Sequence, residues 1–186
     1  MSGISQQLAD AIRVKAATHH IPESLLRAFV LTESSGDMAA TRYEPVYRWI
    51  VDPLTGKPFR RLTTDEAASA MPPADFYPQA PDAAARAGEW RGQRTSWGPM
   101  QVMGAVARER GFRGPFEQLN GVWGLYCGCL LLERLRERFL SGFGWQGVAA
   151  AYNAGTPRRT GNGRWENQQY IDKLRRNGAR FEEYDR

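Results

Sequence analysis

The sequence predicts a mainly helical fold with a small β-hairpin, and three observations lead to this prediction. Apolar residues recur every three or four positions over much of the chain, as they do on amphipathic helices. Aromatic and β-branched residues gather in one stretch, 42–61, around a turn signal. The 186 residues match one ordinary domain, long enough to bury a core without metal or disulfide support.

Two helices are expected near the N-terminus. Over residues 3–19 the apolar side chains follow helical spacing, which predicts an amphipathic first helix. Pro22, with Glu23 behind it, suits the first turn of a second helix, and Gly36 suits its end.

The middle of the chain carries less regular signals. Residues 52–56, Asp-Pro-Leu-Thr-Gly, supply the turn of the expected hairpin. Thr63 or Thr64 is expected to cap a short helix that ends at Ala70. Residues 71–96 are rich in Pro, Ala and Arg, so we expect an irregular segment there.

Helical spacing returns after Gly98. The two cysteines lie two positions apart on the longest expected helix, so their side chains point to different sides of it. A disulfide between them would be strained, and two thiols make a poor zinc site, so we expect Cys127 and Cys129 in the core. Helices are expected at 99–110, 119–140, 145–153 and 165–177.

The composition excludes several classes of protein. Apolar residues make up 42% and charged residues 24%, which is typical of a globular chain rather than a disordered one. No apolar run reaches the length of a membrane span, and the first 20 residues lack the apolar core of a Sec signal peptide. The net charge of +5 comes mostly from arginine and favours an anionic partner, such as nucleic acid, a membrane surface or a cell-wall polymer.

Glu33 is the first candidate for chemistry. Counting back along the expected second helix, Val30, Phe29 and Leu26 share its face, so Glu33 lies on the apolar stripe at the helix C-terminus. Burial and the negative end of the helix dipole both raise the pKa of a carboxyl group, as a general acid requires. The structural alternative is a buried glutamate satisfied by an arginine or a backbone amide.

Three sequence blocks follow one another along the chain: Glu33-Ser34-Ser35-Gly36, Gly98-Pro99-Met100-Gln101 and Ala151-Tyr152-Asn153-Ala154-Gly155. Their content and order resemble those of the soluble lytic transglycosylase and goose-type lysozyme superfamily. The resemblance implies a lysozyme-like helical domain over residues 1–186. It also implies a glycosidase that cleaves the β-1,4 bond between N-acetylmuramic acid and N-acetylglucosamine in peptidoglycan.

The resemblance also implies roles for particular residues. Glu33 matches the catalytic acid of the family. The remaining matches are expected to bind or contact substrate: Ser34, Met100, Gln101, Tyr152, Asn153 and, as the aromatic residue of the last helix, Tyr170. Their amides and aromatic rings suit sugar hydroxyl and N-acetyl groups. The structural alternative for each residue taken alone is core packing.

Two departures from the family pattern stand out. Pro99 stands where leucine is common, and it is a tolerated residue at a helix start. Gly98 follows Glu33 by 65 positions, a much longer gap than the family usually has. We interpret residues 37–97 as an inserted β and irregular lobe that could wall the groove.

A hydrolytic muramidase usually needs a second carboxylate, whereas a transglycosylase can use the substrate's own groups. The best candidate is Glu44, in Arg42-Tyr43-Glu44-Pro45-Val46-Tyr47-Arg48-Trp49, a string that resembles a stretch common in phage-borne wall hydrolases. Arg42 and Arg48 would favour its charged form. A plain ion pair with Arg48 is the structural alternative, and Asp37 and Asp52 are weaker candidates.

We therefore expect a peptidoglycan muramidase of the phage-lysin kind, with a lytic transglycosylase as the alternative. It would be made in the host cytoplasm and act as a monomer on the glycan strands of periplasmic peptidoglycan, without a metal or other cofactor. A basic C-terminal segment could touch lipopolysaccharide through Lys173, Arg175, Arg176 and Arg180. The alternatives from other classes are a basic domain that binds nucleic acid or the envelope without catalysis, and an inactive virion protein; no nucleic-acid-binding motif is visible.

Overall fold

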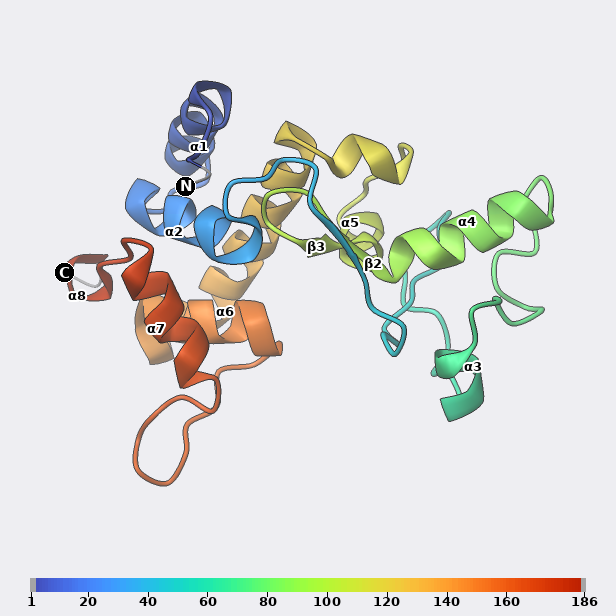
Figure 1. The fold of residues 1–186 in the computed structure, drawn as a ribbon. Helices are drawn as coiled ribbons and strands as arrows, with labels where there is room; N and C mark the ends of the chain where they lie inside the picture. The colour runs from blue at the N-terminus through green and yellow to red at the C-terminus, as the bar shows by residue number, and fades with distance from the viewer. Residues whose placement is uncertain (1–2, 185–186) are drawn as a thin grey trace.

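The structure is a computed structural model that describes residues 3–184; residues 1–2 and 185–186, the ends of the expected 1–186 domain, lie outside it. The fold is mainly helical, as the sequence predicts, and it carries one small antiparallel sheet (Figure 1). The helices are α1 (Gln6–Thr18), α2 (Glu23–Ser34), α3 (Thr64–Ala68), α4 (Ala83–Gln93), α5 (Gly104–Glu109), η1 (Phe116–Leu119), α6 (Val122–Ala154), α7 (Gln168–Arg176) and α8 (Phe181–Tyr184). The strands are β1 (Thr41–Tyr43), β2 (Thr95–Trp97) and β3 (Val102–Met103), in that spatial order.

The two N-terminal helices form as expected. The Ser5 hydroxyl accepts a hydrogen bond from the Leu8 amide and caps α1, which packs on α2. At the C-terminal end of α2, Ser35 adopts the left-handed conformation, and Gly36 also has a positive φ, +86°. The last helical residue, Ser34, therefore lies two residues before the glycine that marks the stop in the sequence.

Helix α6 forms the centre of the helical body, where it contacts α1, α7 and η1 (Figure 1). It unites the expected helices 119–140 and 145–153, and only Gly144 interrupts it, with φ 61° and ψ −174°. Cys127 and Cys129 are buried free thiols of its core face, and burial raises their pKa values to about 11 and about 12. Neither thiol is therefore poised as a nucleophile at neutral pH.

The hairpin expected over 42–61 forms only in a minimal version. The Asp52 carboxylate accepts hydrogen bonds from the Leu54 and Thr55 amides, and a single bridge between Val51 and Pro58 closes the turn. The Asp52 amide donates to the carbonyl of Lys57, and the Phe59 amide donates to the carbonyl of Ile50. The strand that does form, β1, pairs instead with β2, with Thr41 opposite Trp97.

The irregular segment expected over 71–96 is also wrong in its second half. The Asp82 carboxylate caps α4 by accepting from the Ala85 amide, and strand β2 follows directly after the helix. The cap and the alanine-rich run behind it are helix signals that the prolines before them obscured. In contrast, the short helix capped by Thr63 is confirmed as α3, with a reciprocal bond between Thr63 and Glu66. The helix expected over 99–110 begins only at Gly104, because β3 precedes it.

Residues 37–97 form a lobe with a small core of its own, separate from the core of the helical body (Figure 1). The buried guanidinium of Arg94 holds this lobe together, since it donates hydrogen bonds to the carbonyls of Ser69, Ala67 and Pro45. Two chain segments, one at Pro45 and one at the end of α3, therefore converge on one side chain. The lobe core consists of Ile50, Leu62, Ala67, Phe76 and Trp90.

Two negative results concern the described residues. Within residues 3–184, no helix combines the length and the apolar character needed to cross a membrane. In the same part of the chain, no three side chains of His, Cys, Asp or Glu lie close enough together to hold a metal ion.

The lobe meets the helical body where α4 packs on α5, and this contact gives a test of the fold. A Cβ added at Gly104 would overlap the carbonyl oxygen of Gly92. We expect Gly104→Ala to lower the free energy of unfolding in urea by about 1–3 kcal/mol, the usual cost of overpacking. Gly88→Ala, on an exposed face of α4 with open space around it, is the control and should be stabilising by about 0.5–1 kcal/mol. Equal stability of Gly104→Ala and the parent would contradict this packing.

Candidate active site

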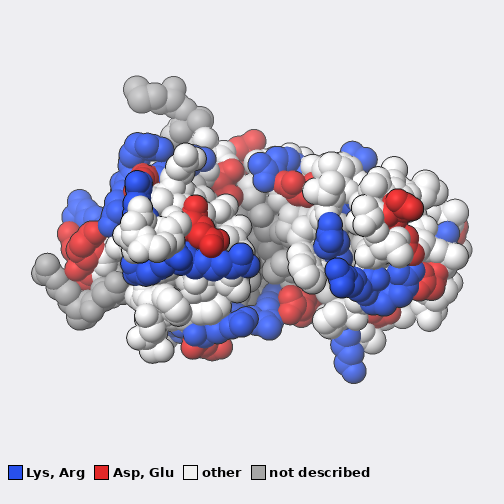
Figure 2. Space-filling view, turned by 90° about the horizontal axis from the view of Figure 1, so that it is seen from below, with Lys and Arg blue, Asp and Glu red and all other residues white. Residues whose placement is uncertain are grey.

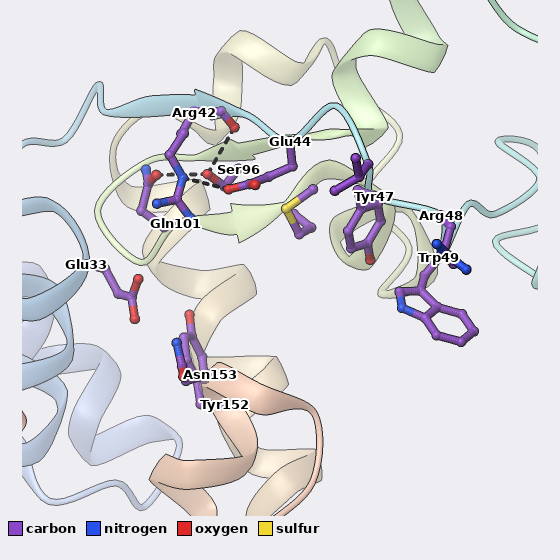
Figure 3. Close-up of a pocket in the computed structure, with 12 residues that line it drawn as sticks. Glu33, Arg42, Glu44, Tyr47, Arg48, Trp49, Ser96, Gln101, Tyr152 and Asn153 are labelled. Carbon is purple, nitrogen blue, oxygen red and sulfur yellow. Dashed lines mark hydrogen bonds and ion pairs between the residues drawn. The ribbon is translucent and has the colours of Figure 1, made fainter. Parts of the chain in front are cut away.

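A pocket of about 420 Å³ lies where the lobe meets the helical body. The molecular surface is hollowed between these two parts, with Lys and Arg side chains on both sides of the hollow (Figure 2). Glu33 reaches the pocket from α2, Glu44 from the segment after β1, and Tyr152 and Asn153 from α6 (Figure 3). The remaining lining residues are Arg42, Val46, Tyr47, Arg48, Trp49, Ser96, Gln101 and Met103.

Glu33 stands at the C-terminal end of α2, on the helix face that also carries the buried Phe29 and Val30. Burial raises the pKa of its carboxyl group, and a hydrogen bond donated by the Tyr170 hydroxyl offsets part of this rise. Lys173 lowers the pKa further, from a position where its ammonium donates to the carbonyl of Thr32 at 2.5 Å. The net effect is the raised pKa that the sequence predicts, with a tyrosine as the direct partner in place of the arginine or amide of the structural alternative.

Two tyrosines surround this carboxyl group, and both pack on the ring of Phe29. The pKa values of Tyr152 and Tyr170 are raised well above 10, chiefly by burial and then by the charge of Glu33. Both hydroxyls therefore stay protonated at neutral pH. Tyr170 can donate only while it keeps its proton, so it is a permanent hydrogen-bond donor to Glu33.

The carboxylate of Glu44 faces the same pocket from the lobe side (Figure 3). It pairs with Arg42, with 2.6 Å between Nε and Oε1, and its own amide donates to the carbonyl of Arg94. The partner is therefore Arg42 and not Arg48, the pairing considered from the sequence. The side chain of Glu44 remains 31% exposed, so the carboxylate is held in place but accessible.

Asp37 and Asp52, the weaker candidates for a second carboxylate, serve elsewhere among the described residues. The carboxylate of Asp37 accepts a hydrogen bond from the Ala39 amide, and that of Asp52 closes its own turn. Neither lines the pocket.

Gln101 lines the pocket, but its amide group is occupied by the protein. Its Nε2 donates to the carbonyls of Ala40 and Gly98, and its Oε1 accepts from the Ser96 hydroxyl at 2.8 Å. The residue has a φ of +48°, a conformation that non-glycine residues adopt only when their surroundings hold them there. Gln101 therefore shapes the wall of the pocket by joining β2 to the segment before β1.

Ser34 and Met100, both expected to contact substrate, lie behind the wall. The Ser34 hydroxyl donates to the carbonyls of Val30 and Pro99, each at 3.0 Å. The second bond attaches α2 to the loop at residues 98–101. Met100 is fully buried against Gly128, so the structure corrects its expected place in the groove. Its carbonyl accepts from the Tyr152 hydroxyl at 2.6 Å. The methionine that lines the pocket is Met103.

A second hollow, of about 510 Å³, adjoins the first at Asn153. Amide side chains dominate it, and the Asn153 side-chain oxygen accepts a hydrogen bond from the Asn167 amide there. Tyr170 lines this hollow as well. The other amides in it belong to Asn162, Gln168 and Gln169. A polar ligand longer than the first pocket would thus find donors and acceptors beyond it.

Several lining residues were missed by sequence analysis. Tyr47 and Trp49 belong to the string around Glu44, so the concentration of aromatic residues there was an available signal. Ser96 and Met103 reach the pocket only because β2 pairs with β1 and β3, with Ser96 opposite Met103. No local pattern in the sequence reveals that pairing.

The pocket thus presents a carboxyl group of raised pKa and an ion-paired carboxylate on separate walls, with amide and aromatic groups between them. This arrangement suits acid catalysis on a polar, hydroxyl-bearing ligand. Comparisons of the chain with protein-family models, curated proteins and solved structures found no match.

The hydrogen bond between Tyr170 and Glu33 can be tested without any assumption about activity. The hydroxyl favours the charged carboxylate, so Tyr170→Phe is expected to raise the pKa of Glu33 still further. Titration of carboxyl-labelled glutamate by NMR measures the change. Tyr152→Phe is the control, since that hydroxyl bonds to Met100, and the pKa of Glu33 should stay close to the parent value. A fall of the pKa in Tyr170→Phe would refute the assignment.

Proposed function

We propose that the protein is a glycosidase that cleaves the β-1,4 bond between N-acetylmuramic acid and N-acetylglucosamine in peptidoglycan, with Glu33 as the general acid. The observation that carries this proposal is the raised pKa of a carboxyl group that lines an open pocket. A carboxylic acid that keeps its proton toward neutral pH can protonate a leaving oxygen. The order of the three sequence blocks described above points to the same chemistry.

In the proposed reaction, Glu33 gives its proton to the glycosidic oxygen as the bond from that oxygen to the anomeric carbon breaks. Positive charge develops on the sugar ring, and a water molecule then supplies the new hydroxyl group. Glu44, on the lobe side of the pocket, is the proposed base that holds this water and takes its proton. With two carboxylates assigned, the protein is a muramidase.

Sugar binding is proposed for the exposed polar and aromatic groups near these carboxylates. Asn153 is exposed and uses its side-chain oxygen toward Asn167, which leaves its amide hydrogens for a ligand. Trp49 is 73% exposed and offers a flat apolar face. The amide-rich hollow beyond Asn153 supports a polymeric substrate over a single sugar.

A lytic transglycosylase, which forms a 1,6-anhydro product, is the second candidate. The ion pair between Glu44 and Arg42 favours it, since a carboxylate already engaged by an arginine is less free to orient a water molecule. In that case the substrate's own 6-hydroxyl group would replace water, and Glu44 would only shape the pocket.

The anionic cell envelope is the proposed setting of the reaction, in keeping with the net charge of +5. The C-terminal residues lend limited support to a contact with lipopolysaccharide. Arg175 and Arg180 pair with acidic neighbours, and Lys173 bonds to the carbonyl of Thr32. Arg176 is the remaining cation of this segment, and in the described chain it has no such partner.

Glu33→Gln tests the proposed acid. The variant is expected to lose about 10²–10⁴-fold in the rate of release of soluble fragments from purified peptidoglycan, the usual contribution of general acid catalysis. Glu23→Gln, at the exposed start of the same helix, is the matched control and should keep the parent rate. Because the acid must be protonated, activity of the parent should fall as the pH rises through the pKa of Glu33, above the ordinary value of 4.5. Full activity of Glu33→Gln would rule the assignment out.

Glu44→Gln, with mass analysis of the products, separates the two candidate reactions. A muramidase leaves a reducing end, which is heavier by one water than the 1,6-anhydro product of a transglycosylase. We expect reducing ends from the parent and a loss of at least about tenfold in Glu44→Gln, because the base is removed. Anhydro products together with unchanged activity of the variant would favour the transglycosylase.

A further inference from the structure

A third depression, of about 490 Å³, adjoins the catalytic pocket on the lobe side. We call it the lobe depression; it runs from Tyr47–Trp49 along residues 58–61 to the start of α5. Residues 47–49 line both the pocket and the depression, so the two are neighbours that share a wall. Arg48 and Trp49 lie at the end of the pocket away from Glu33 (Figure 3).

The lining of the lobe depression differs in chemistry from that of the pocket. Its walls are mostly aromatic and aliphatic, with Trp49, Phe59 and Val106 among them. No Asn, Gln, Ser or Thr of the described chain lines it, whereas the pocket has Ser96, and the amide-rich hollow has several such residues. Apart from Tyr47 and Trp49, only the charged side chains of its rim can bond to sugar hydroxyls, so the lobe depression is less suited to another unit of the glycan than the amide-rich hollow.

The charges at its rim do not cancel. Arg60 is neutralised by Glu66 and Asp75, each at 2.6 Å, and Glu109 pairs with Arg134. The other two cations of the rim are Arg48 and Arg61. Both are exposed, and within residues 3–184 neither guanidinium has an ion pair, hydrogen bond or ring contact. The lobe depression therefore combines an apolar floor with two guanidinium groups available to carboxylates.

We propose that the lobe depression binds the peptide stem that branches from the N-acetylmuramoyl sugar, an inference that rests on the proposed function. The stem consists of small apolar residues and free carboxylates, which match the aromatic walls and the two unpaired arginines. The stem branches laterally from the glycan strand, so its binding site should lie beside the catalytic pocket and share a wall with it. Residues 47–49 supply that wall. The lobe would thus make the enzyme selective for strands that still carry peptides.

Arg61→Gln tests this inference, because Arg61 lines the lobe depression and not the catalytic pocket. The substrates are soluble glycan strands with intact stems and the same strands after an amidase has removed the stems. Chain shortening, followed by chromatography, gives kcat/KM for hydrolase and transglycosylase alike. Arg27→Gln removes the same charge from an exposed position of α2, outside the pockets described above, and is the matched control.

We expect Arg61→Gln to lower kcat/KM about three- to tenfold on strands with stems, the effect of one charge-assisted hydrogen bond at an exposed site. The same variant should match the parent on strands without stems, and Arg27→Gln should match it on both. An equal loss on both substrates would assign the depression to the glycan and overturn the inference, as would no loss on either. If the parent cleaves neither substrate, the proposed function itself fails, which is a separate result.

Discussion

The loop at residues 98–101 joins the elements that carry the candidate site. Gly98 has a φ of +68°, and an added Cβ there would overlap the carbonyl oxygen of Leu119, so the turn requires glycine. Beyond this turn, the loop bonds to three other parts of the chain. The Pro99 carbonyl accepts from Ser34 on α2, and the Met100 carbonyl accepts from Tyr152 on α6. Gln101 bonds to the segment before β1. The two walls of the pocket are therefore set by one short loop, and their spacing depends on it.

The buried position of Glu33 lowers the stability of the folded protein but suits the proposed acid catalysis. Burial at the end of a helix disfavours its charged form, and Tyr170 and Lys173 compensate for only part of that cost. Since the folded pKa is raised, the unfolded chain ionises more readily, and Glu33 works against folding at pH values above the unfolded pKa. This penalty vanishes at acidic pH, where both states are protonated. A residue kept in such a place is typical of functional sites, where local rules are broken for the sake of reactivity.

Much of the helical body could be predicted from the sequence, because its signals are local. The apolar spacing located α1, α2 and α7, and a threonine cap at Thr63 or Thr64 marked the start of α3. The sheet could not be predicted, since Thr41 pairs with Trp97 across the entire lobe. The site divides in the same way. Glu33 lies where helical spacing predicts it. Met103 lines the pocket in place of Met100, because of the left-handed turn at Gln101 and the pairing of β2 with β3.

The pairing of β1 with β2 has a consequence for how the fold can vary. The lobe leaves the helical body at β1 and returns at β2, so its two ends lie side by side in one antiparallel ladder. The parts of the lobe that do not pack on the helical body can therefore change in length or sequence without separating α2 from the loop that precedes β3. One wall of the pocket is thus fixed to the helices, whereas the other, with Glu44 and Trp49, belongs to an exchangeable module. A graft at this ladder could transfer a different recognition surface onto the same carboxyl group of α2.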